Sequence, residues 1–143
     1  MDCHRRDNLQ PAHWERASPA TPDAIARLAD CAGVDLPDDY LSFLGLSNGG
    51  EGSLGIEPGW FQIWPAATVV RYNAEYELQV YVPGCFAFGS SGGGELLAFD
   101  ARGSKPWPVV MIPCIGMSPN TVVRIATDFA EFTRHFGHDC PAA

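Results

Sequence analysis

His135, His138 and Cys140 form the pattern His-x-x-His-x-Cys near the C-terminus. Imidazole and thiolate groups are the usual ligands of zinc, and no other cluster in the sequence has this chemistry. A structural zinc site generally needs about four ligands that the fold holds in place, whereas these three lie where the last predicted helix ends. We therefore favour exposed tail residues over a metal site, and we expect no metal and no other cofactor.

Cysteine can also act as a nucleophile, and the chain has five cysteines. Cys31, Cys85 and Cys114 lie in apolar sequence surroundings, where thiols usually pack as inert core residues. An odd number of cysteines without a Cys-x-x-Cys pair is the opposite of a secreted disulfide framework, so we expect reduced thiols. No Gly-x-Ser-x-Gly nucleophile elbow is expected either, because the glycine-rich residues 89–93 run into an apolar stretch typical of a strand and not into a helix. We predict that the chain is not an enzyme, and a small thiol- or metal-dependent enzyme is a less favoured alternative.

A glycine-rich segment, residues 88–95, is the one candidate for a phosphate-binding loop. The exposed amides of such a loop can hold an anion. A P-loop, however, ends in Gly-Lys-Ser/Thr and opens a helix, whereas this segment ends in Gly-Glu and runs into an apolar stretch typical of a strand. The segment therefore predicts a hairpin turn.

Negative charge is concentrated in residues 21–60. This stretch contains seven acidic residues and one basic residue, Arg27, and so carries six of the eight net negative charges. An acidic surface attracts a basic protein and speeds its association. Trp60 and Trp64 are predicted to be exposed aromatic anchors, because protein interfaces often use tryptophan in this way. The predicted partner-binding residues are Asp35, Asp38, Asp39, Glu51, Glu57, Trp60 and Trp64.

The overall composition narrows the class of partner. Of the 143 residues, 46% are hydrophobic and 18% are charged, which is typical of one globular domain. The net charge of −8 repels nucleic acid, and the single lysine, Lys105, leaves no polybasic patch for a membrane surface. We expect a basic protein as partner, and neither nucleic acid nor membrane. The alternative is an acidic face that only keeps the protein soluble.

The N-terminal residues predict a cytoplasmic protein. Arg5 and Arg6 are not followed by the apolar segment of a secretory signal. The most apolar stretch, residues 109–117, is interrupted by Pro113 and Gly116 and is shorter than the ~20 residues needed to cross a bilayer. We therefore expect no membrane span.

Two helices are predicted in the first third of the chain. Residues 21–23, Thr-Pro-Asp, are a typical helix start, and Gly33 supplies a left-handed stop. A second, shorter helix ends at residues 47–50, Ser-Asn-Gly-Gly, which tolerate a positive φ. Residues 1–20 show no sustained periodicity and are interpreted as a leader that docks Trp14 at most.

The middle of the chain predicts a loop over residues 51–59, a strand over residues 60–64 and a helix that begins at Pro65. The apolar spacing of this helix predicts a buried face made of Val69, Tyr72 and Tyr76. Its predicted solvent side holds Arg71, Asn73, Glu75 and Glu77.

From residue 85 onward the pattern changes to short strands, expected at residues 85–88, 95–99, 109–112 and 121–126. Thr127 and Asp128 then cap a last helix whose phenylalanines repeat at helical spacing. Segregated helices and strands predict an α+β fold, with an antiparallel-rich sheet and helices packed mainly on one face. The predicted organisation is an N-terminal leader segment over residues 1–20, one domain over residues 21–137 and a C-terminal tail over residues 138–143.

Three motifs resemble a known family. Residues 36–44, L-P-D-D-Y-L-S-F-L, followed by S-N-G-G-E-G at residues 47–52, are similar to the L-P-x-x-Y-x-x-F-L…N-G-G signature of the SUKH superfamily, in its Smi/Knr branch. The glycine turn of residues 88–95 resembles the family's hairpin, and residues 125–132 resemble its closing I-A-x-x-F-x-E-F helix. The motifs occur in family order and span about residues 20–136.

This resemblance implies an α+β domain of the Smi/Knr-like SUKH fold, with no cofactor and no enzymatic activity. Bacterial members are typically immunity proteins that bind and neutralise toxin domains, often nucleases, delivered between competing cells. Fungal relatives are regulatory interaction proteins in cell-wall signalling. The implied function is a non-enzymatic protein-binding domain, an immunity protein for a cognate toxin domain, with an intracellular regulatory scaffold as the alternative. The matching positions are mostly scaffold residues, so they transfer the fold better than the partner.

Overall fold

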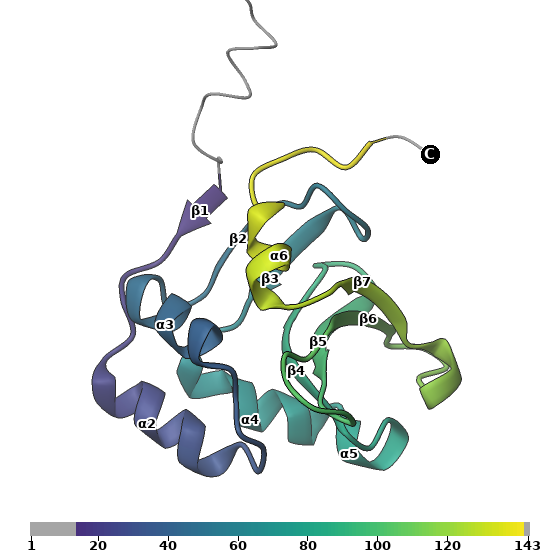
Figure 1. The fold of residues 1–143 in the computed structure, drawn as a ribbon, viewed down its shortest axis with the longest axis horizontal. Coiled ribbons are helices and arrows are strands. Elements are labelled where there is room, and N and C mark those ends of the chain that lie inside the picture. The colour runs from purple at the N-terminus through teal and green to yellow at the C-terminus, as the bar shows by residue number, and fades with distance from the viewer. Residues whose placement is uncertain (1–13, 142–143) are drawn as a thin grey trace, which may run out of the picture.

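The computed structural model describes residues 14–141. Within these residues, seven strands form one sheet in which each strand pairs antiparallel with the next along the chain, in the order β1 to β7 (Figure 1). The strands are β1 (Trp14–Arg16), β2 (Gly50–Ser53), β3 (Trp60–Ile63), β4 (Cys85–Ser90), β5 (Glu95–Asp100), β6 (Val109–Pro113) and β7 (Val123–Ala126). The helices are α2 (Pro22–Cys31), α3 (Asp38–Leu46), α4 (Ala66–Glu75), α5 (Leu78–Tyr81) and α6 (Phe129–Arg134), with a 3-10 turn η1 (Pro119–Thr121). None of these helices is long and apolar enough to cross a membrane.

The helices pack against the sheet through aromatic rings. In Figure 1, α6 lies in front of β2 and β3, with α3 beside it and α2 and α4 together below. Phe43 of α3 packs edge-on against Phe129 of α6, and Phe61 of β3 stacks on Phe136 just beyond α6, with ring centroids 3.8 Å apart. The α+β class and its antiparallel sheet are therefore confirmed.

Two of the predicted helix starts are confirmed by capping hydrogen bonds. The Thr21 hydroxyl accepts a hydrogen bond from the N–H of Ala24, and the Asp128 carboxylate accepts one from the N–H of Glu131. Caps of this kind stabilise a helix by about 1 kcal/mol each. Gly33, just beyond α2, has a φ of +78°, the left-handed conformation that ends a helix.

The glycine-rich segment is a hairpin turn between β4 and β5, as predicted. The Ser91 hydroxyl accepts hydrogen bonds from the N–H groups of Gly93 and Glu95 at 3.0 and 3.2 Å, and it donates one to the Glu95 carboxylate at 2.7 Å. These two amides are held by the protein's own groups, and the carboxylate beside them repels an anion. The turn therefore shapes the sheet and does not resemble a phosphate-binding loop.

Strands β1 and β2 differ from the expected leader and loop. Trp14 of β1 stacks on Phe43 at 5.7 Å and packs edge-on against Phe61 and Phe136. Gly52 makes room for the start of the Trp14 side chain, because a Cβ there would lie 2.5 Å from the Cβ of Trp14. Glycine has little intrinsic preference for strands, so a stretch with the sequence GEGS gives no strand signal. The chain from Trp14 onward therefore packs as part of the domain.

The Ser-Asn-Gly stretch after α3 is a junction between segments as well as a helix stop. The Ser47 hydroxyl donates to the carbonyl of Gly49 at 2.6 Å, and the Asn48 side-chain oxygen accepts from the N–H of Ala66, the first residue of α4, at 2.7 Å. Gly49 has a φ of +98°, and a Cβ there would lie 2.5 Å from the carbonyl oxygen of Ile63. This position therefore requires glycine.

Asn73 is buried, which contradicts the prediction that it faces solvent. Only 7% of its surface is exposed. Its side-chain amide donates to the carbonyls of Val69 and Ala87, and its side-chain oxygen accepts from the N–H of Ala87, each at 2.8 Å. Ala87 lies where β4 bulges, outside the stretch that pairs with β3. Asn73 thus forms the hydrogen bonds with Ala87 that a neighbouring strand would otherwise form. Tyr76, which was predicted to be buried, is 40% exposed.

Tyr40 lies in the core among the rings of Phe88, Phe99 and Phe129, and its hydroxyl has no hydrogen-bond partner among the described residues. A buried hydroxyl without a partner costs about 1–3 kcal/mol, whereas an apolar group of the same shape avoids this cost. We expect Tyr40→Phe to raise the free energy of unfolding by about 1 kcal/mol in urea denaturation. A decrease of similar size would show that the hydroxyl is hydrogen bonded.

Candidate protein-binding surface

The seven predicted partner-binding residues fall into two separate groups. One group lies at the start of α3 and contains Asp35, Asp38 and Asp39. The other lies on and after strands β2 and β3 and contains Glu51, Glu57, Trp60 and Trp64.

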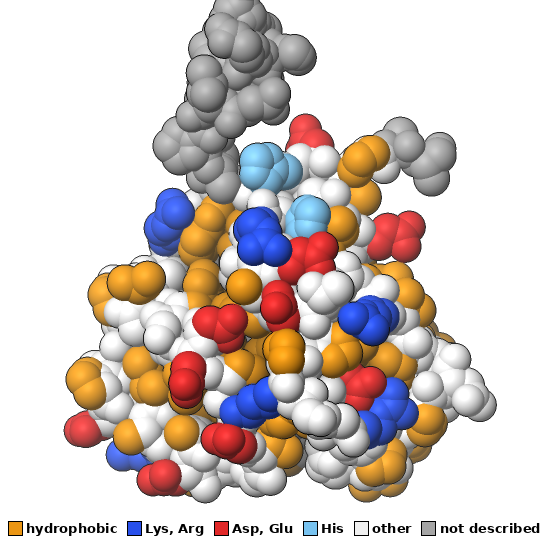
Figure 2. All heavy atoms as spheres, viewed as in Figure 1, with side chains coloured by type: hydrophobic (Ala, Val, Ile, Leu, Met, Phe, Trp, Pro, Cys, Tyr) orange, Lys and Arg blue, Asp and Glu red, His pale blue; other side chains and the backbone are white. Residues whose placement is uncertain are grey.

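The first group belongs to an acidic face that α3 shares with α6. Asp38 and Asp39 are exposed in the first turn of α3, and Asp128 caps α6. Partial burial raises the pKa of Asp39 above its ordinary value, and the negative charges of Asp128 and Asp38 raise it further. Figure 2 shows acidic side chains gathered over these two helices. We call Asp38, Asp39 and Asp128 the α3/α6 acidic face, which attracts cations because its like charges lie close together.

Asp35 contributes less free charge to this region. The Nζ of Lys105 lies 3.0 Å from Oδ2 of Asp35 and also donates to the carbonyl of Leu36. The Asp35 side chain is 94% exposed, and an exposed pair of this kind stabilises a fold by about 0–1 kcal/mol. The lysine therefore offsets the charge of Asp35 without adding much stability.

The second group lies on a different face of the sheet. Glu51 of β2 is directly opposite Glu15 of β1 and Gln62 of β3, so these three side chains lie on one face. Trp60 is 40% exposed and lies on the same face, two residues before Gln62. Glu57 is exposed in the loop between β2 and β3. The acidic stretch of the sequence is thus divided between two surfaces.

The expectation that Trp64 is an exposed anchor is wrong. Its side chain is only 8% exposed. The Tyr72 ring packs edge-on against it at 4.9 Å, and the Tyr76 ring lies parallel to it at 6.3 Å. The N–H of Trp64 also donates to the carbonyl of Phe88, which fixes the chain between β3 and α4. Trp64 is covered because α4 folds back over the end of β3.

The region of the C-terminal histidines is tied to the domain. The N–H of Gly137 donates to the carbonyl of Ser53, and the N–H of Gly55 donates to the carbonyl of His135, both at 2.8 Å. The His135 side chain is partly buried, with its Nε2 3.8 Å from Oε2 of Glu131, while His138 is exposed. Among residues 14–141, no three His, Cys, Asp or Glu side chains are grouped to hold a metal ion.

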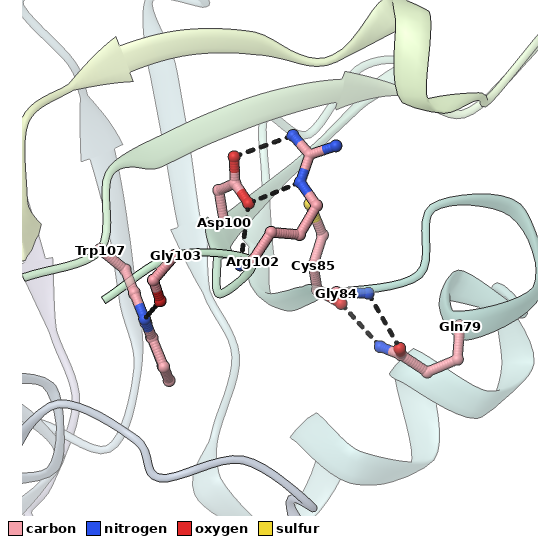
Figure 3. Close-up of polar contacts among 7 residues, drawn as sticks. All are labelled: Gln79, Gly84, Cys85, Asp100, Arg102, Gly103 and Trp107. Atoms are coloured by element: carbon pink, nitrogen blue, oxygen red, sulfur yellow. Dashed lines mark hydrogen bonds and ion pairs between the residues drawn. The ribbon is translucent and has the colours of Figure 1, made fainter. Parts of the chain in front are cut away.

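Cys85 is the most buried thiol among the described residues and lies beside the ion pair of Asp100 and Arg102 (Figure 3). Burial raises the pKa of Cys85 to about 11, and the charge of Asp100 adds to this shift. Burial also raises the pKa of Cys114. Because the thiolate is the reactive form, both residues are poor nucleophiles at neutral pH. Their surroundings differ from those of a catalytic cysteine.

Asp100 and Arg102 form two hydrogen bonds at the end of β5, at 2.8 and 2.9 Å (Figure 3). These bonds lower the pKa of Asp100 below its ordinary value. A lowered folded-state pKa means that the carboxylate stabilises the fold above its unfolded-state pKa, and this contribution disappears as pH falls through the folded-state pKa.

We expect Asp100→Asn to be less stable than the unmodified protein by about 0.5–1 kcal/mol at neutral pH, because the pair is partly exposed. The difference should shrink toward zero as the pH is lowered from about 5 to about 2. Urea denaturation at a series of pH values measures it. A difference that grows toward low pH would contradict the assignment.

Two further acidic residues lie on these surfaces and are not among the predicted partner-binding residues. Asp128 is predicted only as a helix cap, and it reaches α3 because Phe129 packs on Tyr40. Glu15 lies in the predicted leader, and it joins Glu51 through the pairing of β1 with β2. No local pattern marks either residue, because tertiary contacts bring both into place.

Comparison with known families identifies the scaffold. A family model described as the SMI1 / KNR4 family (SUKH-1) matches residues 19–135, whereas comparison with curated proteins gave no match. The matched stretch runs from just before α2 to just after α6, and it includes the Ser-Asn-Gly junction, the glycine hairpin and the α3/α6 acidic face. It covers far more than half of the 143 residues and confirms the resemblance that the three motifs predict. The chain therefore belongs to the SMI1/KNR4 family (SUKH-1).

Proposed function

We propose that this chain is a protein-binding domain that acts as an immunity protein, which binds a cognate basic toxin domain and neutralises it. The family supports a binding role, and one observation carries the choice of a basic partner. Asp38 and Asp39 are exposed in the first turn of α3, and Asp128 caps α6. Burial raises the pKa of Asp39, and the nearby charges of Asp128 and Asp38 raise it further. A toxin domain that cleaves nucleic acid needs a basic surface for phosphates, and that surface is complementary to this acidic face.

The acidic face acts mainly on the speed of association. Complementary charges raise the association rate constant of two proteins from about 10⁵–10⁶ to as much as about 10⁸ M⁻¹s⁻¹ at low salt. Exposed carboxylates at a helix start suit this role, because they lose little solvation before contact. Occlusion of the basic surface of the toxin would then keep its substrate away.

A binding role is also consistent with the chemistry of the described residues. Members of this family are generally not enzymes. The pKa values of Cys85 and Cys114 are both raised, so neither thiol is poised as a nucleophile at neutral pH. These observations support binding over a thiol-dependent enzyme.

The test is binding to the purified toxin domain encoded beside this gene, measured by titration calorimetry. We expect a one-to-one complex whose affinity falls at least about tenfold between low and high salt, because charge complementarity is screened. An unrelated basic protein of the same net charge serves as control. No binding at low salt, or equal binding to the control, would contradict the proposal. The absence of a toxin gene among the neighbouring genes, together with binding to an intracellular protein, would favour a regulatory scaffold.

A further inference from the structure

A groove lies on the sheet face that carries Gln62 and continues along α4. It consists of three adjoining hollows of about 390, 500 and 400 Å³. The first hollow, beside β1 and β2, shares Gln62 and Trp64 with the second, and the second shares Glu75 and Tyr76 with the third. These shared residues join the hollows into one groove that runs from β1 to the loop after β6. We call it the sheet groove.

Partly exposed aromatic rings lie along the sheet groove. Tyr76 and Tyr81 line its hollows and are 40% and 49% exposed, and Trp60 lies on the same strand face as Gln62. Ile115, next to the third hollow, is 93% exposed. Four of the seven large hydrophobic side chains that are exposed among the described residues thus follow this groove. Tyrosine and tryptophan dominate the binding energy of protein interfaces, so this clustering indicates a surface that another chain covers.

Carboxylates lie between these rings. Glu15, Glu51 and Glu75 line the hollows, against one guanidinium, that of Arg16. Arg16 stacks over a tryptophan ring of its own strand at 4.4 Å. Glu75 lies 3.6 Å from Arg71, but both side chains are 60% exposed and such a pair is weak. The groove therefore combines aromatic faces with an excess of negative charge.

We propose that the sheet groove binds an extended, arginine-bearing segment of the protein partner. A guanidinium group stacks on an aromatic face and at the same time forms two parallel hydrogen bonds with a carboxylate. Glu75 beside Tyr76, in the second hollow, offers this combination. Glu51 opposite Gln62 offers a second carboxylate in the first hollow. The row of hollows suits a segment whose successive side chains enter one hollow after another.

This inference rests on the proposed function, because it takes a basic protein as partner, but it assigns a different task to a different surface. The α3/α6 acidic face attracts the partner from solution, whereas the sheet groove holds a segment of it in place. Long-range charge acts on association, and close contacts with rings and carboxylates act on dissociation. Variants of the two surfaces are therefore expected to change different rate constants.

Titration of the full-length, ¹⁵N-labelled protein with acetyl-Gly-Arg-Gly-Arg-Gly-amide tests the groove without a toxin. We expect saturable chemical-shift changes at Glu51, Gln62 and Tyr76, weaker binding of the lysine counterpart and none of the citrulline counterpart, which is neutral. The variant Glu51→Gln/Glu75→Gln should bind the arginine peptide about three- to tenfold more weakly. Asp23→Asn/Asp30→Asn, the matched control on exposed positions of α2, removes the same charge elsewhere and should change the affinity less than about twofold.

The outcomes separate the two proposals. Shift changes confined to α3 and α6, equal binding of the citrulline peptide, or no saturable binding would overturn the groove assignment. Concentration-dependent shifts without peptide would overturn it in favour of a second copy of the chain. Equal binding of the toxin domain to the unmodified protein and to Glu51→Gln/Glu75→Gln would overturn the groove assignment and leave the proposed function intact. Binding of the arginine peptide in the groove without any binding of the toxin domain would support the groove assignment and contradict the proposed function.

Discussion

Replacement of Asn73 with alanine is expected to lower the free energy of unfolding by about 2–4 kcal/mol. The substitution deletes three hydrogen bonds of 2.8 Å and leaves the N–H and the carbonyl of Ala87 buried without partners. Each buried backbone group without a partner costs about 1–3 kcal/mol. Ala87 is itself fully buried, so water does not replace the amide without a rearrangement of β4. Urea denaturation followed by circular dichroism measures this loss.

Arg71→Ala is the matched control for Asn73→Ala, because it changes an exposed residue of the same helix. Its pair with Glu75 is 60% exposed on both sides, so we expect a change within about 0.5 kcal/mol. Asn73→Asp separates the two kinds of hydrogen bond. Its carboxylate can accept from the N–H of Ala87, but it cannot donate to the carbonyls of Val69 and Ala87. A loss below about 1 kcal/mol for Asn73→Ala would show that the Ala87 backbone finds other partners.

The double charge reversal Asp38→Lys/Asp39→Lys is expected to slow association with the basic toxin domain by about tenfold to a hundredfold at low salt. Both carboxylates are exposed beside Asp128 in the α3/α6 acidic face, so their reversal replaces attraction by repulsion at the point of approach. The dissociation rate should change much less, and the difference should shrink as salt is added. Surface plasmon resonance at several salt concentrations separates the two rate constants.

Asp23→Lys/Asp30→Lys is the matched control, because it changes the net charge equally on exposed positions of α2. We expect it to slow association by less than about threefold. Each variant reverses at least one acid in the first turn of a helix, which costs about 0.3–1 kcal/mol, so the stability of both is checked first. Equal slowing by the two variants would mean that overall charge, and not the α3/α6 acidic face, steers the partner.

The helices and the later strands were predictable because their signals are local. Thr21 and Asp128 cap helices through their own side chains, and the phenylalanines of α6 follow helical spacing. The hairpin around Ser91 is specified by glycine and serine within a few residues. Patterns of this kind need no knowledge of the rest of the chain, and the family motifs place them in order.

Strands β1 and β2 were not predictable for the opposite reason. Gly52 is useful because it has no side chain, which leaves room for Trp14, more than thirty residues earlier in the sequence. The value of such a glycine lies in what packs against it. Asn73 is similar. Its polar side chain predicts a solvent-facing position, and only the folded structure shows that the amide is hydrogen bonded to the backbone of Ala87.

The candidate surfaces were predictable in composition but not in arrangement. The acidic bias points to Asp38 and Asp39, which lie together in the first turn of α3, and their part in partner binding stays a prediction. Asp128 joins them only through the packing of α6 on α3, and Glu51 is carried to another face by the pairing of β2. Trp64 is lost as an anchor because Tyr72 covers it.

The most direct measurement is the growth of cells that express the toxin domain encoded beside this gene, with and without this protein. We expect the protein to restore growth, and we expect Asp38→Lys/Asp39→Lys to restore it less well than Asp23→Lys/Asp30→Lys at equal expression. Failure of the unmodified, folded protein to restore growth would contradict its proposed function as an immunity protein.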